Sequence, residues 1–241
     1  MSNGILMASD SNVDFMIHGI WKYPFQIMGQ DVWITTSHIN ILLVMLILIV
    51  FSIVANRKLK KATEVPGSFQ NVVELIVELL DNMVKGSMGS HASKFVNYVS
   101  TLFIFILLSN ISGLLGLRPP TADYGVTFPL GLITFGLIFF NKIKYQGVSG
   151  FLKGLCDPWP FWAPINVIGD VAVPISISLR LFANILSGTV MMALVYGLLS
   201  KIAWGWPGIL HLYFDLFSGA IQTYVFCMLT MTYIADAIGD N

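Results

Sequence analysis

The residue whose chemistry is hardest to explain by packing alone is Arg180, which lies inside a long apolar segment. Apolar and small residues surround it in Ile175–Asn184. A guanidinium keeps its proton, and placing it at the centre of a bilayer costs about 3 kcal/mol on insertion scales and more than about 10 in simulations. Its mid-segment position prevents the side chain from reaching the interface. Arg180 therefore needs a carboxylate or a wet cavity, and the alternative is an ion pair that only fixes packing.

A polar stripe continues from this arginine along the same helical face. Asn184 lies one turn after Arg180, and side chains four residues apart are neighbours on a helix. Gly188 lies one further turn along and would permit close approach of another helix.

A second polar set lies in the last apolar segment. His211, Asp215 and Gln222 are separated by four and seven residues, with Ser218 between them. In an α-helix these spacings put the side chains on one face, where they could pass protons through side chains and water. As alternatives, His211 alone is also typical of an interfacial histidine, and Gln222 alone of a residue that joins two helices.

A third set, at the start of the segment that holds Arg180, consists of Asn166, Gly169 and Asp170. Asp170 is also explained by the helix dipole, which favours an acid near a helix N-terminus. The two cysteines, Cys156 and Cys227, lack metal-ligand spacing. We expect neither a metal nor a cofactor.

The composition identifies the kind of element that must carry these residues. Hydrophobic residues make up 56% of the 241 residues, charged residues only 11%, and the net charge is zero. Mean hydropathy is +0.76. Soluble domains carry about 25% charged residues, so a disordered chain, a nucleic-acid binder and an ordinary soluble enzyme are excluded. The chain is expected to be an all-α, polytopic membrane protein embedded in the lipid bilayer.

We expect a polar N-terminal arm over 1–37 on the outer side, with a short amphipathic piece around Ile20–Met28, and a membrane domain over 38–241. The arm lacks the basic start and apolar stretch of a signal peptide. A span needs about 20 apolar residues. The predicted spans are 39–55, 95–117, 126–140, 165–199 and 207–237. In residues 68–85, apolar and acidic side chains recur with the period of a helix and so fall on two different faces. This predicts an amphipathic helix on the membrane surface.

The distribution of Lys and Arg predicts the orientation, because cytoplasmic segments are enriched in these residues. With the N-terminus outside and the C-terminus in the cytoplasm, nine of the 13 basic residues fall on the inner side and three on the outer side. The inner ones are Arg57, Lys58, Lys60, Lys61, Lys85, Lys94, Lys142, Lys144 and Lys153, and the outer ones are Lys22, Arg118 and Lys201. Arg180 is the remaining one.

The last two spans are longer than a bilayer is thick. As helices, 165–199 and 207–237 would measure about 52 and 46 Å, against about 30 Å of hydrocarbon. Only Lys201–Trp206 separates them. We therefore expect an antiparallel hairpin that is steeply tilted, kinked at Pro174, or extended beyond the membrane.

Three stretches of the sequence resemble a known family. Ser178-Leu-Arg-Leu-Phe-Ala-Asn-Ile-Leu-Ser-Gly188 is similar to the signature of subunit a of the rotary F-type ATP synthase. Asn110-Ile-Ser-Gly-Leu-Leu-Gly with Pro119-Pro-Thr-Ala-Asp-Tyr-Gly-Val-Thr127 resembles its second helix end and following loop, and Ile221-Gln-Thr-Tyr-Val-Phe-Cys-Met-Leu-Thr230 its last helix. The resemblance covers roughly residues 35–237.

The resemblance implies an ion-translocating subunit that performs no bond chemistry itself. Its partners would be a ring of c subunits, the peripheral-stalk b subunits and the rest of the synthase, most simply in a bacterial inner membrane. Arg180 would match the essential arginine between two half-channels, and Asn184 and Gln222 its supporting polar residues. The outer channel would be lined by Asn184, His211, Asp215, Ser218 and Gln222. The inner channel would be lined by Asn166 and Asp170, and the ion would be H⁺ or Na⁺.

Three positions depart from the family pattern. Thr189 stands where many bacterial members carry a carboxylate or histidine, and Asp215 stands where His or Glu is common. Asn166 stands where Glu is frequent, and Asp170, one turn later, is a possible substitute.

Two other classes of protein share some of these sequence features. A secondary transporter also needs buried charge, but such folds usually contain repeats, and the Arg180 pattern has no second copy. An intramembrane serine protease would use Ser149 of Gly147-Val-Ser-Gly150, with His211 as its base. Ser149 lies among lysines in a predicted inner loop, which argues against it.

Overall fold

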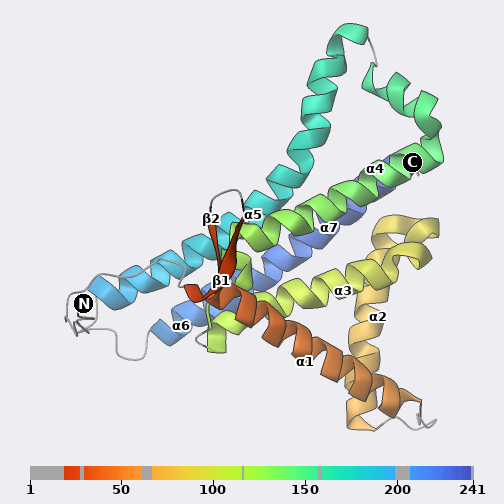
Figure 1. The fold of residues 1–241 in the computed structure, drawn as a ribbon. Helices are drawn as coiled ribbons and strands as arrows, with labels where there is room; N and C mark the ends of the chain where they lie inside the picture. The colour runs from red at the N-terminus through yellow and green to blue at the C-terminus, as the bar shows by residue number, and fades with distance from the viewer. Residues whose placement is uncertain are drawn as a thin grey trace.

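The computed structural model consists of helices joined by short connections, with one β-hairpin near the N-terminus (Figure 1). It describes residues 19–27, 30–60, 67–115, 117–156, 159–198 and 207–239. Within them, five helical stretches are long and apolar enough, by length and composition, to cross a membrane. This confirms the expected all-α class with five long apolar helices that are candidate membrane spans.

The hairpin was not expected from the sequence, which predicts a polar arm over 1–37 with a short amphipathic piece around Ile20–Met28. Strand β1 (Gly19–Ile27) pairs antiparallel with β2 (Gln30–Thr35). Both strands are rich in aromatic and branched residues, which favour extended backbone. The pairing shifts register between Lys22 and Gln26, around Pro24, which has no N–H to donate to the ladder. Residues 1–18 of the predicted arm lie outside the described residues.

Helix α1 (Thr36–Leu59) follows the hairpin directly and lies at the edge of the molecule (Figure 1). It is apolar on nearly every face, and most of its large side chains are exposed. Such a helix is stable only when lipid or protein covers it. A hydrogen bond ties α1 to the segment after η2: the Asn40 side-chain amide donates to the backbone carbonyl of Arg118 at 2.8 Å.

Helix α2 (Ser68–Met88) turns through the 3₁₀ segment η1 (Gly89–His91) into α3 (Ala92–Ile111), against which it packs. One face of α2 is buried, through Val73, Leu80, Val84 and Met88. Its other side exposes both apolar and acidic side chains: Val72, Leu75, Ile76, Val77, Leu79, Glu74 and Glu78. After α3 the chain continues through the 3₁₀ segments η2 (Ser112–Leu115) and η3 (Pro120–Ala122).

Helix α4 (Tyr124–Leu155) and helix α5 (Ala163–Leu198) pack against each other and come into close backbone contact at a glycine. A Cβ added to Gly131 of α4 would lie 2.7 Å from the backbone carbonyl oxygen of Pro174 in α5. Only glycine permits this backbone approach. Farther along, α4 bends at Gly147, which has a φ of 71°. A short 3₁₀ turn, η4 (Pro160–Trp162), precedes α5.

The last helical stretch is not one uniform α-helix, contrary to the simplest expectation for 207–237. It begins as α6 (Pro207–His211), continues as a π-helix, η5 (Leu212–Ser218), and becomes α7 (Gly219–Ile238). Helix α7 packs against α3, α4 and α5. The buried core lies between α2, α3, α5 and α7, with Ile106, Leu181, Phe226 and Met231 among its fully buried side chains. The joint Lys201–Trp206 lies outside the described residues.

Candidate functional site

Arg180 lies near the midpoint of α5 with its side chain exposed. Leu179 and Ile175 beside it are exposed as well, so the surrounding surface is apolar. Within the described part of the chain, Arg180 forms no ion pair or hydrogen bond. The partner that the sequence argument requires is therefore not among these residues, and the reading of Arg180 as an internal ion pair that fixes packing is not supported.

Asn184, one turn after Arg180, connects α5 to the π-helix. Its side-chain amide donates to the Ser218 hydroxyl at 2.9 Å, across 34 residues of sequence. The structure thus brings together two of the predicted polar residues from different helices. Gly188, one further turn along, lies against Phe214, with a hypothetical Cβ 3.4 Å from the phenylalanine Cβ, which is ordinary contact.

His211 and Asp215 are also brought together. His211 Nδ1 and Asp215 Oδ2 are 2.7 Å apart across the junction of α6 and η5. The Asp215 residue is only 8% exposed. Its carboxyl group packs against η2, where a Cβ added to Gly113 would lie 3.0 Å from Asp215 Cγ. An imidazole and a carboxyl group at hydrogen-bond distance can exchange a proton between them.

The π-helix changes the prediction that His211, Asp215, Ser218 and Gln222 share one helical face. A π-helix bonds each residue to the fifth one along and so carries more residues per turn than an α-helix. Residues four and seven positions apart between His211 and Gln222 therefore do not all lie on one helical face, as they would in a regular α-helix. Gln222 is buried, but no hydrogen bond joins its side chain to Asp215 or Ser218. π-Helical turns are frequently found at functional sites.

Sequence reasoning missed a buried polar network that holds the end of this π-helix. The Asn110 amide donates to the Gly219 carbonyl at 3.0 Å and to the Thr223 hydroxyl at 3.1 Å, and the Thr121 hydroxyl donates to Asn110 Oδ1 at 2.6 Å. These side chains are almost fully buried. An asparagine at the end of an apolar helix was the available signal, because buried amides need partners.

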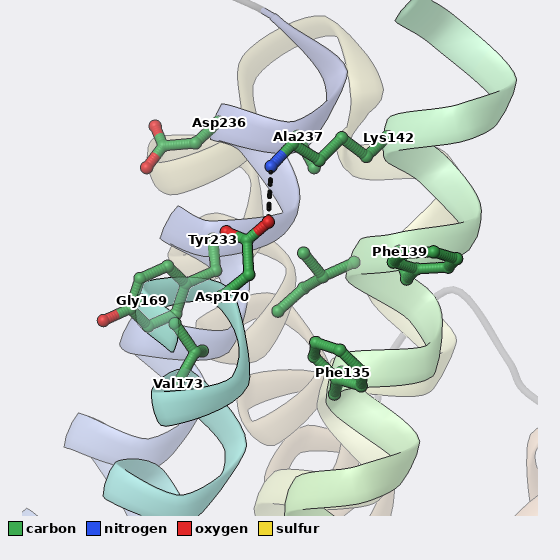
Figure 2. Close-up of a pocket in the computed structure, with 10 residues that line it drawn as sticks. Phe135, Phe139, Lys142, Gly169, Asp170, Val173, Tyr233, Asp236 and Ala237 are labelled. Carbon is green, nitrogen blue, oxygen red and sulfur yellow. Dashed lines mark hydrogen bonds and ion pairs between the residues drawn. The ribbon is translucent and has the colours of Figure 1, made fainter. Parts of the chain in front are cut away.

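Asn166 and Asp170 lie toward the N-terminal end of α5. The Asn166 amide donates to the Leu155 carbonyl at 2.9 Å, across the turn from α4. Asp170 forms an ion pair with Lys142 of α4, with 2.9 Å between Nζ and Oδ2 (Figure 2). From the sequence, Lys142 is predicted only as one of nine basic residues on the inner side, so this pairing was not predicted.

A cavity of about 250 Å³ adjoins this ion pair. Its lining comes from α4, α5 and α7 and includes aromatic residues, Lys142, Asp170, Tyr233 and Asp236 (Figure 2). Tyr233 and Asp236 were not predicted as site residues. The chain therefore carries two polar regions on either side of Arg180, one around the Lys142–Asp170 pair and one around the π-helix.

No group of three or more His, Cys, Asp or Glu side chains in the described ranges is arranged to hold a metal ion. Cys227 is buried in α7, whereas Cys156 is exposed at the end of α4. Ser149 lies beyond the bend of α4 at Gly147, with its side chain exposed.

Comparison with known proteins finds the same family that the sequence motifs resemble. The family model of the ATP synthase A chain matches residues 38–235. A sodium ion specific ATP synthase subunit a from Propionigenium modestum is 36% identical, over 93% of this chain and 78% of that protein. The ATP synthase subunit a of Staphylococcus aureus strain JH9 is 33% identical, over 90% of this chain and 96% of that protein.

Proposed function

Since the chain belongs to the ATP synthase A chain family, it is a non-catalytic, ion-translocating membrane subunit of that complex, and we propose that Arg180 couples its ion flow to rotation. In this proposal, subunit a stands beside a ring of c subunits, each carrying one carboxylate within the membrane. Two offset half-channels reach the ring from opposite sides, and Arg180 stands between them.

The observation that carries the proposal is the guanidinium of Arg180, which is exposed and has no partner among the residues that the structure describes. A charge that remains ionised within an apolar surface needs a compensating charge. The described residues supply none, so a carboxylate on another chain is the partner that fits. A passing c-ring carboxylate meets this requirement once for each subunit that moves by.

The positive charge explains the coupling. Beside Arg180 the deprotonated form of a ring carboxylate is favoured, so an arriving site releases its ion into one channel. The emptied site passes the arginine and is reloaded from the other channel. The same charge repels cations and blocks a direct leak. Each elementary charge that crosses contributes about 2.3 kcal/mol per 100 mV of membrane potential.

The polar cluster around the π-helix is proposed to line the outer half-channel. The 2.7 Å contact of His211 with Asp215 and the 2.9 Å bond from Asn184 to Ser218 supply groups that exchange protons or bind water. Gln222 completes this set one to two turns farther along α7. Asn166 and Asp170 are proposed to line the inner half-channel, at the N-terminal end of α5.

The orientation and the tilt of the helices belong to the same proposal. The N-terminal arm, 1–37, is placed outside and the C-terminus in the cytoplasm of a bacterial inner membrane, following the Lys and Arg distribution. The 36 residues of Pro160–Val195 and the 31 of Gly208–Ile238 exceed an upright span, so a steeply tilted hairpin beside the ring is favoured. The exposed apolar and acidic side of α2 suits the membrane surface, and the b subunits are the expected stalk partners.

The ion is H⁺ or Na⁺, and one relative is named as sodium ion specific. The experiment is ATP-driven pumping by vesicles that contain the whole complex, with wild type, Arg180→Ala and the control Arg57→Ala, an exposed arginine at the end of α1. Loss of pumping with Arg180→Ala alone is expected. Na⁺ uptake stimulated by a protonophore identifies Na⁺, and collapse of pumping by the protonophore without Na⁺ dependence identifies H⁺. If Arg180→Ala pumps at full rate with coupling intact, the proposed role of Arg180 is wrong.

A further inference from the structure

Charged groups from three helices meet around the cavity beside the Lys142–Asp170 pair. Lys142 comes from α4, Asp170 from α5 and Asp236 from α7 (Figure 2). The fourth ionisable group in the lining is the Tyr233 hydroxyl, also from α7. The three charged residues are far apart in the sequence, so their gathering around the cavity depends on the tertiary fold.

The charges around the cavity do not cancel. Lys142 and Asp170 neutralise each other at 2.9 Å, and both remain partly exposed. Asp236 is exposed and forms no ion pair within the described residues. With its carboxylates ionised, the cavity has one net negative charge, because two carboxylates face one ammonium.

The lining of the cavity changes from charged to apolar along α5. Its charged groups lie at one end of the cavity, and Phe135 and Val173 lie toward the other (Figure 2). Val173 precedes Arg180 by seven residues, which is about 10 Å along a helix. The cavity therefore connects a charged rim with the part of α5 that leads to the arginine.

We infer that this cavity is the inner cation vestibule of subunit a, and that Lys142 and Asp236 set, with opposite signs, how readily a monovalent cation occupies it. The inference rests on the proposed function, which routes ions past Asp170 to the ring. The shared ligand chemistry is a monovalent cation, H⁺ or Na⁺. Lys142 acts by neutralising Asp170 and repelling the cation, and Asp236 acts by attracting it.

A charge near a partly enclosed, low-dielectric cavity changes the local concentration of cations more than a charge on an open surface does. Removing the Lys142 charge leaves two uncompensated carboxylates, which raises cation occupancy. Removing the Asp236 charge leaves the cavity neutral, which lowers it. Both effects shrink at high ionic strength, because mobile ions screen partly exposed charges.

A purely structural role of the ion pair predicts something different. If Lys142 only docks α4 against α5, its loss lowers stability or maximal rate and leaves the cation dependence unchanged. Opposite shifts in the half-saturating cation concentration from two charge-removing variants cannot arise from loosened packing. They require that both groups face the path of the ion.

The test uses inverted vesicles with the whole complex, in which the face that is cytoplasmic in the cell meets the bath. The initial rate of ATP-driven transport is measured against bath Na⁺ at fixed pH, and against bath pH without Na⁺, so that the two arms distinguish the ions. The variants are Lys142→Gln, Lys142→Arg and Asp236→Asn. The matched control is Lys144→Gln, which removes the same charge from an exposed side chain two residues away that does not line the cavity.

In the arm that corresponds to the transported ion, Lys142→Gln is expected to lower the half-saturating cation concentration about three- to tenfold, and Asp236→Asn to raise it by a similar factor. Lys142→Arg and Lys144→Gln should remain near wild type. Absent shifts, shifts in the same direction, or an equal shift with Lys144→Gln would overturn the inference. Failure of the proposed function is recognised separately, because Arg180→Ala would then pump normally.

Discussion

The contact between Gly113 and the Asp215 carboxyl group allows a sharp test of the outer pathway. Gly113→Ala adds one methyl group in η2 without replacing any ionisable residue. That methyl carbon would lie 3.0 Å from Asp215 Cγ and 3.2 Å from both carboxyl oxygens. Carbon atoms pack at about 3.5–4.0 Å, so the carboxyl group must move by about 0.5 Å.

This displacement acts on the 2.7 Å contact between His211 and Asp215. Overpacking of a tight site costs about 1–3 kcal/mol, and a hydrogen bond weakens steeply when its geometry is lost. If a cost of about 1.4 kcal/mol appears in the barrier to ion transfer, transport slows about tenfold. We therefore expect Gly113→Ala to reduce ATP-driven transport by about this factor.

The assay compares ATP-driven transport with ATP hydrolysis and with the amount of subunit a in the purified complex. Gly136→Ala is the matched control, because a Cβ at that helical glycine meets nothing within 4 Å. The expected result is slowed transport in a fully assembled Gly113→Ala complex and normal transport with Gly136→Ala. An assembled Gly113→Ala complex that transports at the wild-type rate would refute the placement of Asp215 in the path.

Two further outcomes follow from the packing of the helices. Gly131→Ala should destabilise the assembled complex by about 1–3 kcal/mol, because its methyl group would meet the backbone oxygen of Pro174 at 2.7 Å; heating the purified complex and measuring loss of subunit a checks this against Gly136→Ala. Asn110→Ala should cost about 1–3 kcal/mol, because the buried Thr121 hydroxyl loses its acceptor while the Gly219 carbonyl keeps its bond from Thr223, and the same heating experiment should find the exposed control Asn97→Ala unchanged.

The long helices, and the position of Arg180 in the middle of one of them, could be predicted from sequence because both depend on local information. An apolar segment of sufficient length must be helical in lipid, and a charge inside it is expensive wherever the segment lies. The contact of His211 with Asp215 was also within reach, because a spacing of four survives the start of the π-helix.

The remaining features depend on contacts between distant segments. Lys142 and Asp170 are 28 residues apart, and their pairing requires the register in which α4 lies on α5, which Gly131 and Pro174 set. The π-helix likewise depends on more than the propensities of its own residues. Its end is held by Asn110, 109 residues before Gly219.

The contacts on either side of Arg180 have a mechanical consequence. Gly131 supports α5 at Pro174 and Ser178, the buried Leu181 packs it against the core, and Ser218 supports it at Asn184, so α5 is held at several points within about 15 Å around the arginine. A rod held at two points bends under a sideways load by an amount that grows with the cube of the distance between its supports. If the proposed c-ring carboxylates pull on Arg180, so closely supported a stretch of helix yields little, and the reaction force passes into α4 and η5.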